Sequence, residues 1–270
     1  MKFAGKSVVI TGGATGIGLA LATQIGSRGA QITLFEPRSD VLAEAVAGLE
    51  AKGIPAHGFT GDVTERTSLE ALADYAWDVA GPVDAVIANA GVGGLRQSVL
   101  DFDLEAAKRL TEVNYWGVWQ TLQVFGQRFR DSGRASALYA TASENSLFNA
   151  YPFGGGAYLA SKHAVFGLMD MLRREAPANI ETGVILPGWT ATPMTRNMGM
   201  PADEFAARIV DQMEAGEYYL VGHSYNAVRM EERWSEVREA FAKWAPREDG
   251  DEQYDVRLFF ERLQAEKAKG

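Results

Sequence analysis

Cysteine is absent from this chain of 270 residues, and histidine occurs only three times. Without thiols the chain can form neither disulfide bonds nor a thiolate metal site. The histidines, His57, His163 and His223, are widely separated and lack the spacing of metal ligands. We therefore expect no metal centre, and the lack of disulfides is compatible with a reducing compartment.

Long hydrophobic runs are also absent from the sequence. A membrane helix needs about 20 apolar residues, and a signal peptide needs a longer apolar region than the N-terminus offers before its first glycines. The formal net charge of −9 disfavours a partner with a phosphate backbone. The sequence thus predicts a cytoplasmic protein that binds neither a membrane nor nucleic acid.

Short apolar runs alternate with helical patterns along most of the chain, and 47% of its residues are hydrophobic. Such runs are typical of strands buried on both faces of a parallel sheet, with helices in the crossovers. Right-handed crossovers then predict a doubly wound α/β sheet, a Rossmann fold, with about seven strands. Strands are expected at 8–10, 32–35, 56–59, 83–88, 135–140, 181–186 and 218–221, and helices at 16–28, around 42–49 and at about 102–130.

A single domain is expected over residues 1–245. The acidic, glycine-containing segment 246–253 would connect it to a final helix at about 255–267, so that 246–270 form a C-terminal extension. Val256, Phe259, Phe260 and Leu263 follow helical spacing and give that helix an apolar stripe. Because such a stripe rarely stays exposed, we expect it to dock on its own body or on a partner subunit.

The segment TGGATGIG, residues 11–18, follows the first strand and opens the first helix. Its glycines would let the backbone turn sharply and approach a ligand, and the helix N-terminus offers N–H groups to a pyrophosphate. A tight strand–helix turn without a ligand is the alternative interpretation. The expected cofactor contacts in this loop are Gly12, Thr15, Gly16, Ile17 and Gly18.

Glu36 lies 18 residues after Gly18, at the end of the second predicted strand. A carboxylate at that place can accept hydrogen bonds from both adenosine ribose hydroxyls, which is the arrangement expected for NAD. Alternatively, Glu36 could simply begin a turn with Pro37. The glycine loop and Glu36 together favour a dinucleotide site.

Tyr158 and Lys162 are four residues apart and would share one face of a helix. A free tyrosine titrates near ~10, and a neighbouring ammonium is expected to lower that pKa. Tyr158 could then give a proton to a carbonyl oxygen or take one from an alcohol. Taken alone, the pair could equally be a packed tyrosine beside a solvated lysine.

Tyr158-Leu159-Ala160-Ser161-Lys162 is a YxxSK-type segment, and together with TGGATGIG it resembles the short-chain dehydrogenase/reductase family. The resemblance runs from about residue 5 to 222. It implies an oxidoreductase that interconverts an alcohol and a carbonyl compound. Further matching segments follow in order: Asp62-Val63, Asn89-Ala90-Gly91, Asn114 within NYWG, Ser143, and Pro187-Gly188 with Thr192.

The resemblance also implies roles for single residues. Tyr158 would be the general acid or base, Lys162 would hold the nicotinamide ribose, and Ser143 would hydrogen-bond the substrate oxygen. Asn114 would support a water that relays protons past Lys162. The remaining expected cofactor contacts, several of which could instead be structural, are Asp62 and Val63 at the adenine, Asn89 and Gly91 beside the cofactor, and Pro187, Gly188, Thr190 and Thr192 near the nicotinamide.

The interval between Ser143 and Tyr158 is 15 residues, two more than the family usually has. We interpret the intervening loop as enlarged and favour Ser143, because it follows a strand directly. Ser146 is the fallback, and Asn145 occupies the usual position of the serine.

The substrate pocket is expected to be apolar, which suits a hydrophobic or aromatic substrate. The segment at about 190–215 resembles the mobile substrate lid of the family. Some of the candidate residues could instead pack on the core or on a neighbouring subunit. They are Leu95, Phe148, Tyr151, Phe153, Trp189 and Met194.

The sequence thus predicts an NAD(H)-dependent oxidoreductase for a secondary alcohol and its ketone. The alternatives are an NADP-dependent carbonyl reductase, which Arg38 beside Glu36 could favour, and a non-catalytic dinucleotide-binding regulatory protein. The resemblance further implies a homo-oligomer, a tetramer or dimer, built through the helices that carry Asn114 and Tyr158.

Overall fold

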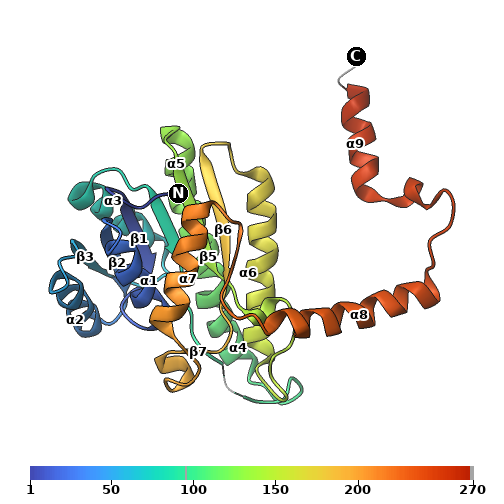
Figure 1. Cartoon of the computed structure of the whole chain (residues 1–270), viewed down its shortest axis with the longest axis horizontal. Coiled ribbons are helices and arrows are strands. Elements are labelled where there is room, and N and C mark those ends of the chain that lie inside the picture. Colours follow the sequence, from blue (N-terminus) through green and yellow to red (C-terminus); the bar gives the residue numbers. More distant parts are fainter. Residues whose placement is uncertain (95, 268–270) are drawn as a thin grey trace. The chain divides into compact units, whose positions relative to one another are not determined.

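Seven parallel strands form the central sheet of the computed structural model, which describes residues 1–94 and 96–267. They lie in the order β3-β2-β1-β4-β5-β6-β9 (Figure 1). The order reverses between β1 and β4, which is the switch point of a doubly wound sheet. The predicted fold class is therefore confirmed. The strands are β1 (Ser7–Thr11), β2 (Gln31–Glu36), β3 (Ala56–Thr60), β4 (Ala85–Ala88), β5 (Ser136–Thr141), β6 (Ile180–Leu186) and β9 (Tyr219–Val221).

Two hydrophobic cores form because alternate residues of each strand face opposite sides of the sheet. Val8 and Ile10 of β1 belong to one core, whereas Val9 belongs to the other. Ile87 and Val86 of β4 divide in the same way. Burial on both faces explains why these strands are continuous apolar runs in the sequence.

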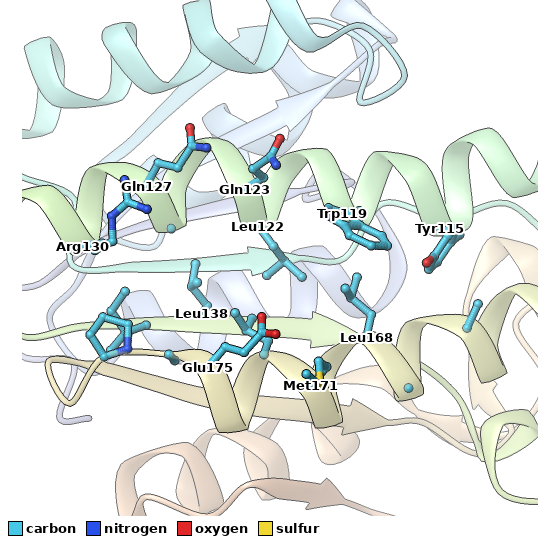
Figure 2. A pocket seen from close by; sticks show the side chains of 17 residues that line it. Tyr115, Trp119, Leu122, Gln123, Gln127, Arg130, Leu138, Leu168, Met171 and Glu175 are labelled. Atoms are coloured by element: carbon cyan, nitrogen blue, oxygen red, sulfur yellow. The ribbon is translucent and has the colours of Figure 1, made fainter. Parts of the chain in front are cut away.

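One face of the sheet is covered by α3 (Arg66–Ala80), α5 (Val118–Ser132) and α6 (Gly156–Glu175). Leu72, Phe125 and Val165 of these helices are fully buried in this core. Between α5 and α6 lies a groove of about 670 Å³, into which Trp119, Leu168 and Met171 project (Figure 2). This face therefore combines a packed interior with an outer groove that is largely apolar but is also lined by Gln127, Arg130 and Glu175.

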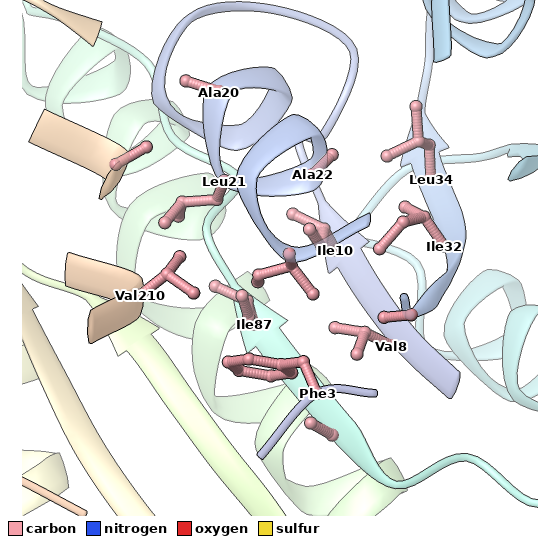
Figure 3. Packing of buried hydrophobic residues seen from close by; sticks show 14 of the residues in the cluster. Phe3, Val8, Ile10, Ala20, Leu21, Ala22, Ile32, Leu34, Ile87 and Val210 are labelled. Atoms are coloured by element: carbon pink, nitrogen blue, oxygen red, sulfur yellow. The ribbon is translucent and has the colours of Figure 1, made fainter. Parts of the chain in front are cut away.

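The other face is covered by α1 (Gly16–Gly26), α2 (Ser39–Glu50) and α7 (Ala202–Ala215). Leu21 of α1 and Val210 of α7 pack over Ile10 and Ile87 of the sheet (Figure 3). Helix α7 thus belongs to the core, although the predicted lid of 190–215 included it. The part of that segment before α7 contains the short strands β7 (Thr190–Ala191) and β8 (Met200–Pro201).

The long helix expected at about 102–130 is interrupted. Helix α4 (Leu104–Thr111) passes into a π-helical turn (Glu112–Gly117), and α5 follows. A π turn adds a residue to one turn of a helix and is often found at functional sites. Apolar periodicity predicted the helix but not this turn, because the spacing of buried residues on either side stays helical.

The first compact unit, Met1–Asn226, is followed by a second, Ala227–Gly270. The second unit contains most of α8 (Asn226–Trp244) and all of α9 (Val256–Lys267), and no residue of either helix is buried. The first unit therefore ends before the predicted boundary at residue 245. In the single chain the apolar stripe of α9 is exposed, and Phe259 and Phe260 are each about half accessible. That it docks on its own body or on a partner subunit stays a prediction.

Candidate active site

A cavity of about 540 Å³ opens at the carboxyl ends of the strands, beside the switch point. Segments far apart in the sequence meet there, as parallel strands require. The expected site residues that line it are Gly12, Thr15, Gly16, Ile17, Glu36, Asp62, Val63, Asn89, Gly91, Ser143, Tyr158, Lys162, Pro187, Gly188, Thr190, Thr192 and Met194.

The backbone of the glycine loop can approach a bound diphosphate closely. Gly12 and Gly16 have φ angles of 61° and 54°, in the left-handed region that favours glycine. A Cβ at Gly12 would lie 2.7 Å from the Cα of Ala90. At the N-terminus of α1 the Thr15 side chain makes no capping hydrogen bond, so the first N–H groups of the helix can face an anion.

Gly18 does not line the cavity. A Cβ there would lie 2.2 Å from the carbonyl oxygen of Gly12 and 2.6 Å from Nδ2 of Asn89. Its role is therefore close packing of α1 against the loop, which keeps the other two glycines in place.

Asn89 connects the ends of three strands at the cavity floor. Its Nδ2 donates to the carbonyl oxygens of Thr11 and Gly12 at 3.2 and 3.1 Å. Its Oδ1 accepts from the hydroxyl of Thr141 at 3.0 Å. Because both ends of the amide are used, Asn89 fixes the glycine loop relative to β4 and β5.

Glu36 ends β2 with its carboxylate almost fully buried. Nε of Arg38 donates to Oε1 of Glu36 at 2.5 Å, and this hydrogen bond raises the pKa of Arg38. Both side chains line the cavity. Arg38, the cation that could bind a phosphate of the cofactor, is therefore already paired with the carboxylate of Glu36.

Tyr158 and Lys162 lie one turn apart on α6, as predicted from their spacing. The Tyr158 hydroxyl hydrogen-bonds the side chain of Ser143. The Nζ of Lys162 lies 5.8 Å from the centre of the Tyr158 ring and donates to the carbonyl oxygen of Thr141 at 2.8 Å. Tyrosine, serine and lysine therefore converge on one wall of the cavity.

The expected lowering of the Tyr158 pKa by Lys162 is not found in this structure. Burial raises the pKa of Tyr158, the neighbouring Tyr151 adds to the rise, and the hydrogen bond from Ser143 opposes it. Burial also lowers the pKa of Lys162 to about 8. Enclosure in protein thus penalises the charged forms of both side chains.

Asn114 is fully buried in the π-helical turn. Its Oδ1 accepts from the backbone N–H of Val92 at 2.8 Å, and its Nδ2 donates to the Val92 carbonyl at 3.0 Å and to the Ser161 hydroxyl at 3.3 Å. A Cβ at Gly91 would lie within 3.5 Å of both Asn114 Oδ1 and Lys162 Nζ. The amide therefore holds the loop after β4 against the helix that carries Tyr158.

The enlarged loop separates the three candidates for the serine position. Ser143 faces Tyr158, whereas the Ser146 hydroxyl donates to the backbone carbonyl of Lys162 at 2.6 Å. Asn145 donates to the Ser143 hydroxyl from its backbone N–H at 3.1 Å and receives a hydrogen bond from Ala150 N–H at 3.2 Å. Ser146 and Asn145 therefore stabilise the loop, and Ser143 alone of the three reaches Tyr158.

The predicted substrate residues are more dispersed. Met194 lines the cavity, and the Tyr151 ring centre lies 6.4 Å from that of Tyr158. Phe148 is buried within the protein, and Phe153 and Trp189 are each about 60% exposed, so these three lie outside the cavity wall. Leu95 lies outside the described residues.

The sequence itself matches the family model for short-chain dehydrogenases over residues 6–202. The chain belongs to the short-chain dehydrogenase/reductase family. Among its relatives, 1-deoxy-11-beta-hydroxypentalenate dehydrogenase of Streptomyces exfoliatus is 31% identical over 246 residues, which cover 86% of this chain and 88% of the relative.

Solved structures of the family share the fold. A short-chain dehydrogenase/reductase from Burkholderia phymatum in complex with NAD superimposes with a TM-score of 0.83, at 24% identity, over 89% of this chain and 96% of that one. An archaeal alcohol dehydrogenase from Thermococcus sibiricus, complexed with 5-hydroxy-NADP, gives 0.69 at 27% identity over 77% and 90%. These two neighbours were thus solved with NAD and with a modified NADP, respectively.

Two groups of this short-chain dehydrogenase were not singled out from the sequence. Thr141 holds Lys162 with its carbonyl and Asn89 with its hydroxyl. Thr141 could have been identified from the sequence because it ends β5, two residues before Ser143. Glu144 is partly enclosed beside this wall, and burial raises its pKa. A carboxyl group next to a motif residue gave no signal of its own.

Ser143→Ala should lower kcat by about 10²–10³-fold, because it removes a hydrogen-bond donor aimed at the reacting oxygen. Ser146→Ala is the matched control. It should leave kcat within a few-fold and cost roughly 1 kcal/mol of stability through the lost hydrogen bond. Initial rates of NAD(P)H formation and thermal unfolding measure the two effects. A larger loss of kcat in Ser146→Ala would contradict this assignment.

Proposed function

We propose that this short-chain dehydrogenase is an NAD(H)-dependent enzyme that interconverts a secondary alcohol and its ketone. The observation that carries the proposal is the hydrogen-bonded pair of Tyr158 and Ser143 in the cavity that the glycine loop also lines. A protein that only binds dinucleotides has no need of a proton donor there. The pair therefore favours catalysis over a regulatory function.

In reduction the substrate carbonyl oxygen accepts hydrogen bonds from Tyr158 and Ser143. The nicotinamide cofactor, when bound, supplies the hydride to the carbonyl carbon. Tyr158 gives its hydroxyl proton to the oxygen as negative charge develops there, and Ser143 stabilises that charge. In oxidation the same groups act in reverse, and Tyr158 takes the proton of the alcohol.

Lys162 serves this reaction from one turn further along α6. With a pKa of about 8, its amine is mostly protonated at pH 7. The ammonium would hydrogen-bond the nicotinamide ribose and favour transient charge on Tyr158. Because both ends of the Asn114 amide already have partners, Asn114 would support a relay water through its backbone carbonyl.

NAD is the proposed cofactor because Glu36 reaches the cavity where the adenosine ribose should lie. A 2′-phosphate beside its carboxylate would bring like charges together. Unit charges about 4 Å apart repel by roughly 4 kcal/mol at an effective dielectric of about 20. Arg38 already pairs with Glu36, so it offers a phosphate less than a full positive charge. NADP remains the alternative.

An apolar substrate is supported by Met194 and Tyr151 beside the catalytic wall. Thioether and aromatic side chains adapt to apolar ligands with few specific polar contacts. The relative from S. exfoliatus is named as a dehydrogenase of a hydroxylated compound, which agrees with an alcohol as substrate. A cytoplasmic location stays a prediction; among the described residues, no helix is long and apolar enough to cross a bilayer.

We further propose that the groove between α5 and α6 is a contact between subunits. Trp119 and Met171 line this groove and are at least 38% exposed, and Trp116, which contacts Trp119, is 45% exposed. Trp116 and Trp119 stack with 5.8 Å between their ring centres, which gives a continuous apolar surface. Exposed aromatic clusters of this kind mark protein interfaces. Dimers formed here would place two copies of α6 near each other.

Tyr158→Phe should lower kcat by about 10²–10⁴-fold, because only the transferable proton is removed. NADH binding, measured by fluorescence titration, should stay unchanged. Tyr75→Phe on α3, at a residue that does not line the cavity, is the control. Retention of more than about a tenth of kcat in Tyr158→Phe would show that the proton comes from elsewhere.

Wild-type enzyme should use NAD in preference to NADP by at least about tenfold in kcat/KM, equivalent to about 1.4 kcal/mol. Glu36→Ala should remove most of that preference because the repulsive carboxylate is gone. Arg38→Gln, in contrast, should leave the NAD reaction close to wild type. Initial rates with both cofactors decide the matter, and equal or better use of NADP by the wild type would reverse the assignment.

Met171→Glu should shift the protein to a smaller oligomer in light scattering, because it buries a charge in the proposed interface. Met198→Glu introduces the same charge at a side chain of similar exposure away from the groove. It should leave the assembly unchanged. Equal behaviour of the two variants would mean that the groove is not an interface.

A further inference from the structure

Helix α8 carries an apolar stripe of its own. Its large apolar side chains recur at alternating intervals of four and three residues, which is the heptad pattern of helices that pair. At about 100° per residue they fall within an arc of roughly 80°. Trp234 is 51% exposed and Phe241 is 64% exposed. The stripe consists of Met230, Trp234, Val237, Phe241 and Trp244.

The stripe is long enough for a helix pair. Helix α8 has 19 residues, which at 1.5 Å per residue make a rod of about 28 Å. The opposite side of the helix is polar, with Glu232 and Glu239. A single apolar seam with a charged back is the arrangement of a helix that packs against one other helix.

In an antiparallel pair of two α8 helices, the stripe of one helix is complementary to the stripe of the other. Trp234 then lies opposite Val237 of the partner subunit, and Met230 lies opposite Phe241 of the partner subunit. Each layer matches a larger side chain with a smaller one, and a two-fold axis repeats every layer. The same segment can therefore supply both halves of the interface.

Charges beside the stripe select this orientation. Glu231 and Arg238 lie on one flank of it, and in the antiparallel register each Glu231 faces Arg238 of the partner subunit. The pair of helices is then joined by two ion pairs between glutamate and arginine. A parallel pair would instead bring Arg233 opposite Arg238 of the partner subunit, which is repulsive. Flanking charges set the orientation of helix pairs in this way.

We propose that α8 is an interaction surface for a second copy of this chain, through an antiparallel pair of α8 helices. This interface is separate from the groove between α5 and α6 and does not depend on the proposed function. Each interface alone gives a dimer.

Charge reversal tests the pairing. Glu231→Arg alone and Arg238→Glu alone should each raise the dissociation constant of the α8 interface at least about tenfold, because two like-charged pairs replace two ion pairs. An equimolar mixture of the two variants should restore assembly, since each variant supplies the charges that the other needs. Sedimentation equilibrium of the full chain, in the wild-type and Met171→Glu backgrounds, measures the constants.

Glu239→Arg, on the opposite side of α8, is the matched control and should leave the constant unchanged. Within one helix Arg238 also contacts Glu231 at 3.1 Å. Both single variants lose that contact, and mixing cannot repair it. Assembly that is unaffected by the single variants, or that mixing fails to restore, would overturn the proposal. If α8 instead docked on its own chain, the variants would lower the unfolding temperature without changing the mass.

Discussion

The buried ammonium of Lys162 is the constraint on which the rest of the site depends. A cation this enclosed needs a fixed oxygen acceptor, and the carbonyl of Thr141 at the end of β5 provides it. Thr141 in turn holds Asn89, and Asn89 holds the backbone of the glycine loop. The end of one strand thus connects the proton-transfer wall to the loop that would bind the diphosphate. Displacement of β5 would disturb both halves of the cavity together.

Much of the fold could be predicted from the sequence because strands buried on both sides are continuous apolar runs. All seven strands lie within two residues of their expected positions. The π-helical turn at Asn114 could not be predicted, because it changes backbone hydrogen bonding without changing the apolar spacing. The end of the first unit at Asn226 was also missed, since α8 has a helical pattern whether or not its stripe is buried.

The functional site, like the fold, could be predicted from the sequence only in part. Tyr158, Gly12 and Gly16, which have a motif around them, line the cavity, whereas Gly18 packs behind the loop. The pKa of Tyr158 moves in the opposite direction to the prediction. That error has a physical origin. Spacing along a helix gives the distance between two charges, whereas the penalty for burying them depends on the whole fold. For the same reason Phe148, Phe153 and Trp189, assigned to the pocket by proximity in sequence, lie elsewhere.

Helix α6 has two functional regions. Tyr158 and Lys162 lie in its first turns, and Met171 projects from a later turn into the groove toward α5 (Figure 2). On the proposed assembly, one rigid rod therefore connects the reacting proton to the neighbouring subunit. Dilution that separates the subunits would release one end of that rod. The specific activity of the enzyme would then decrease as the protein is diluted.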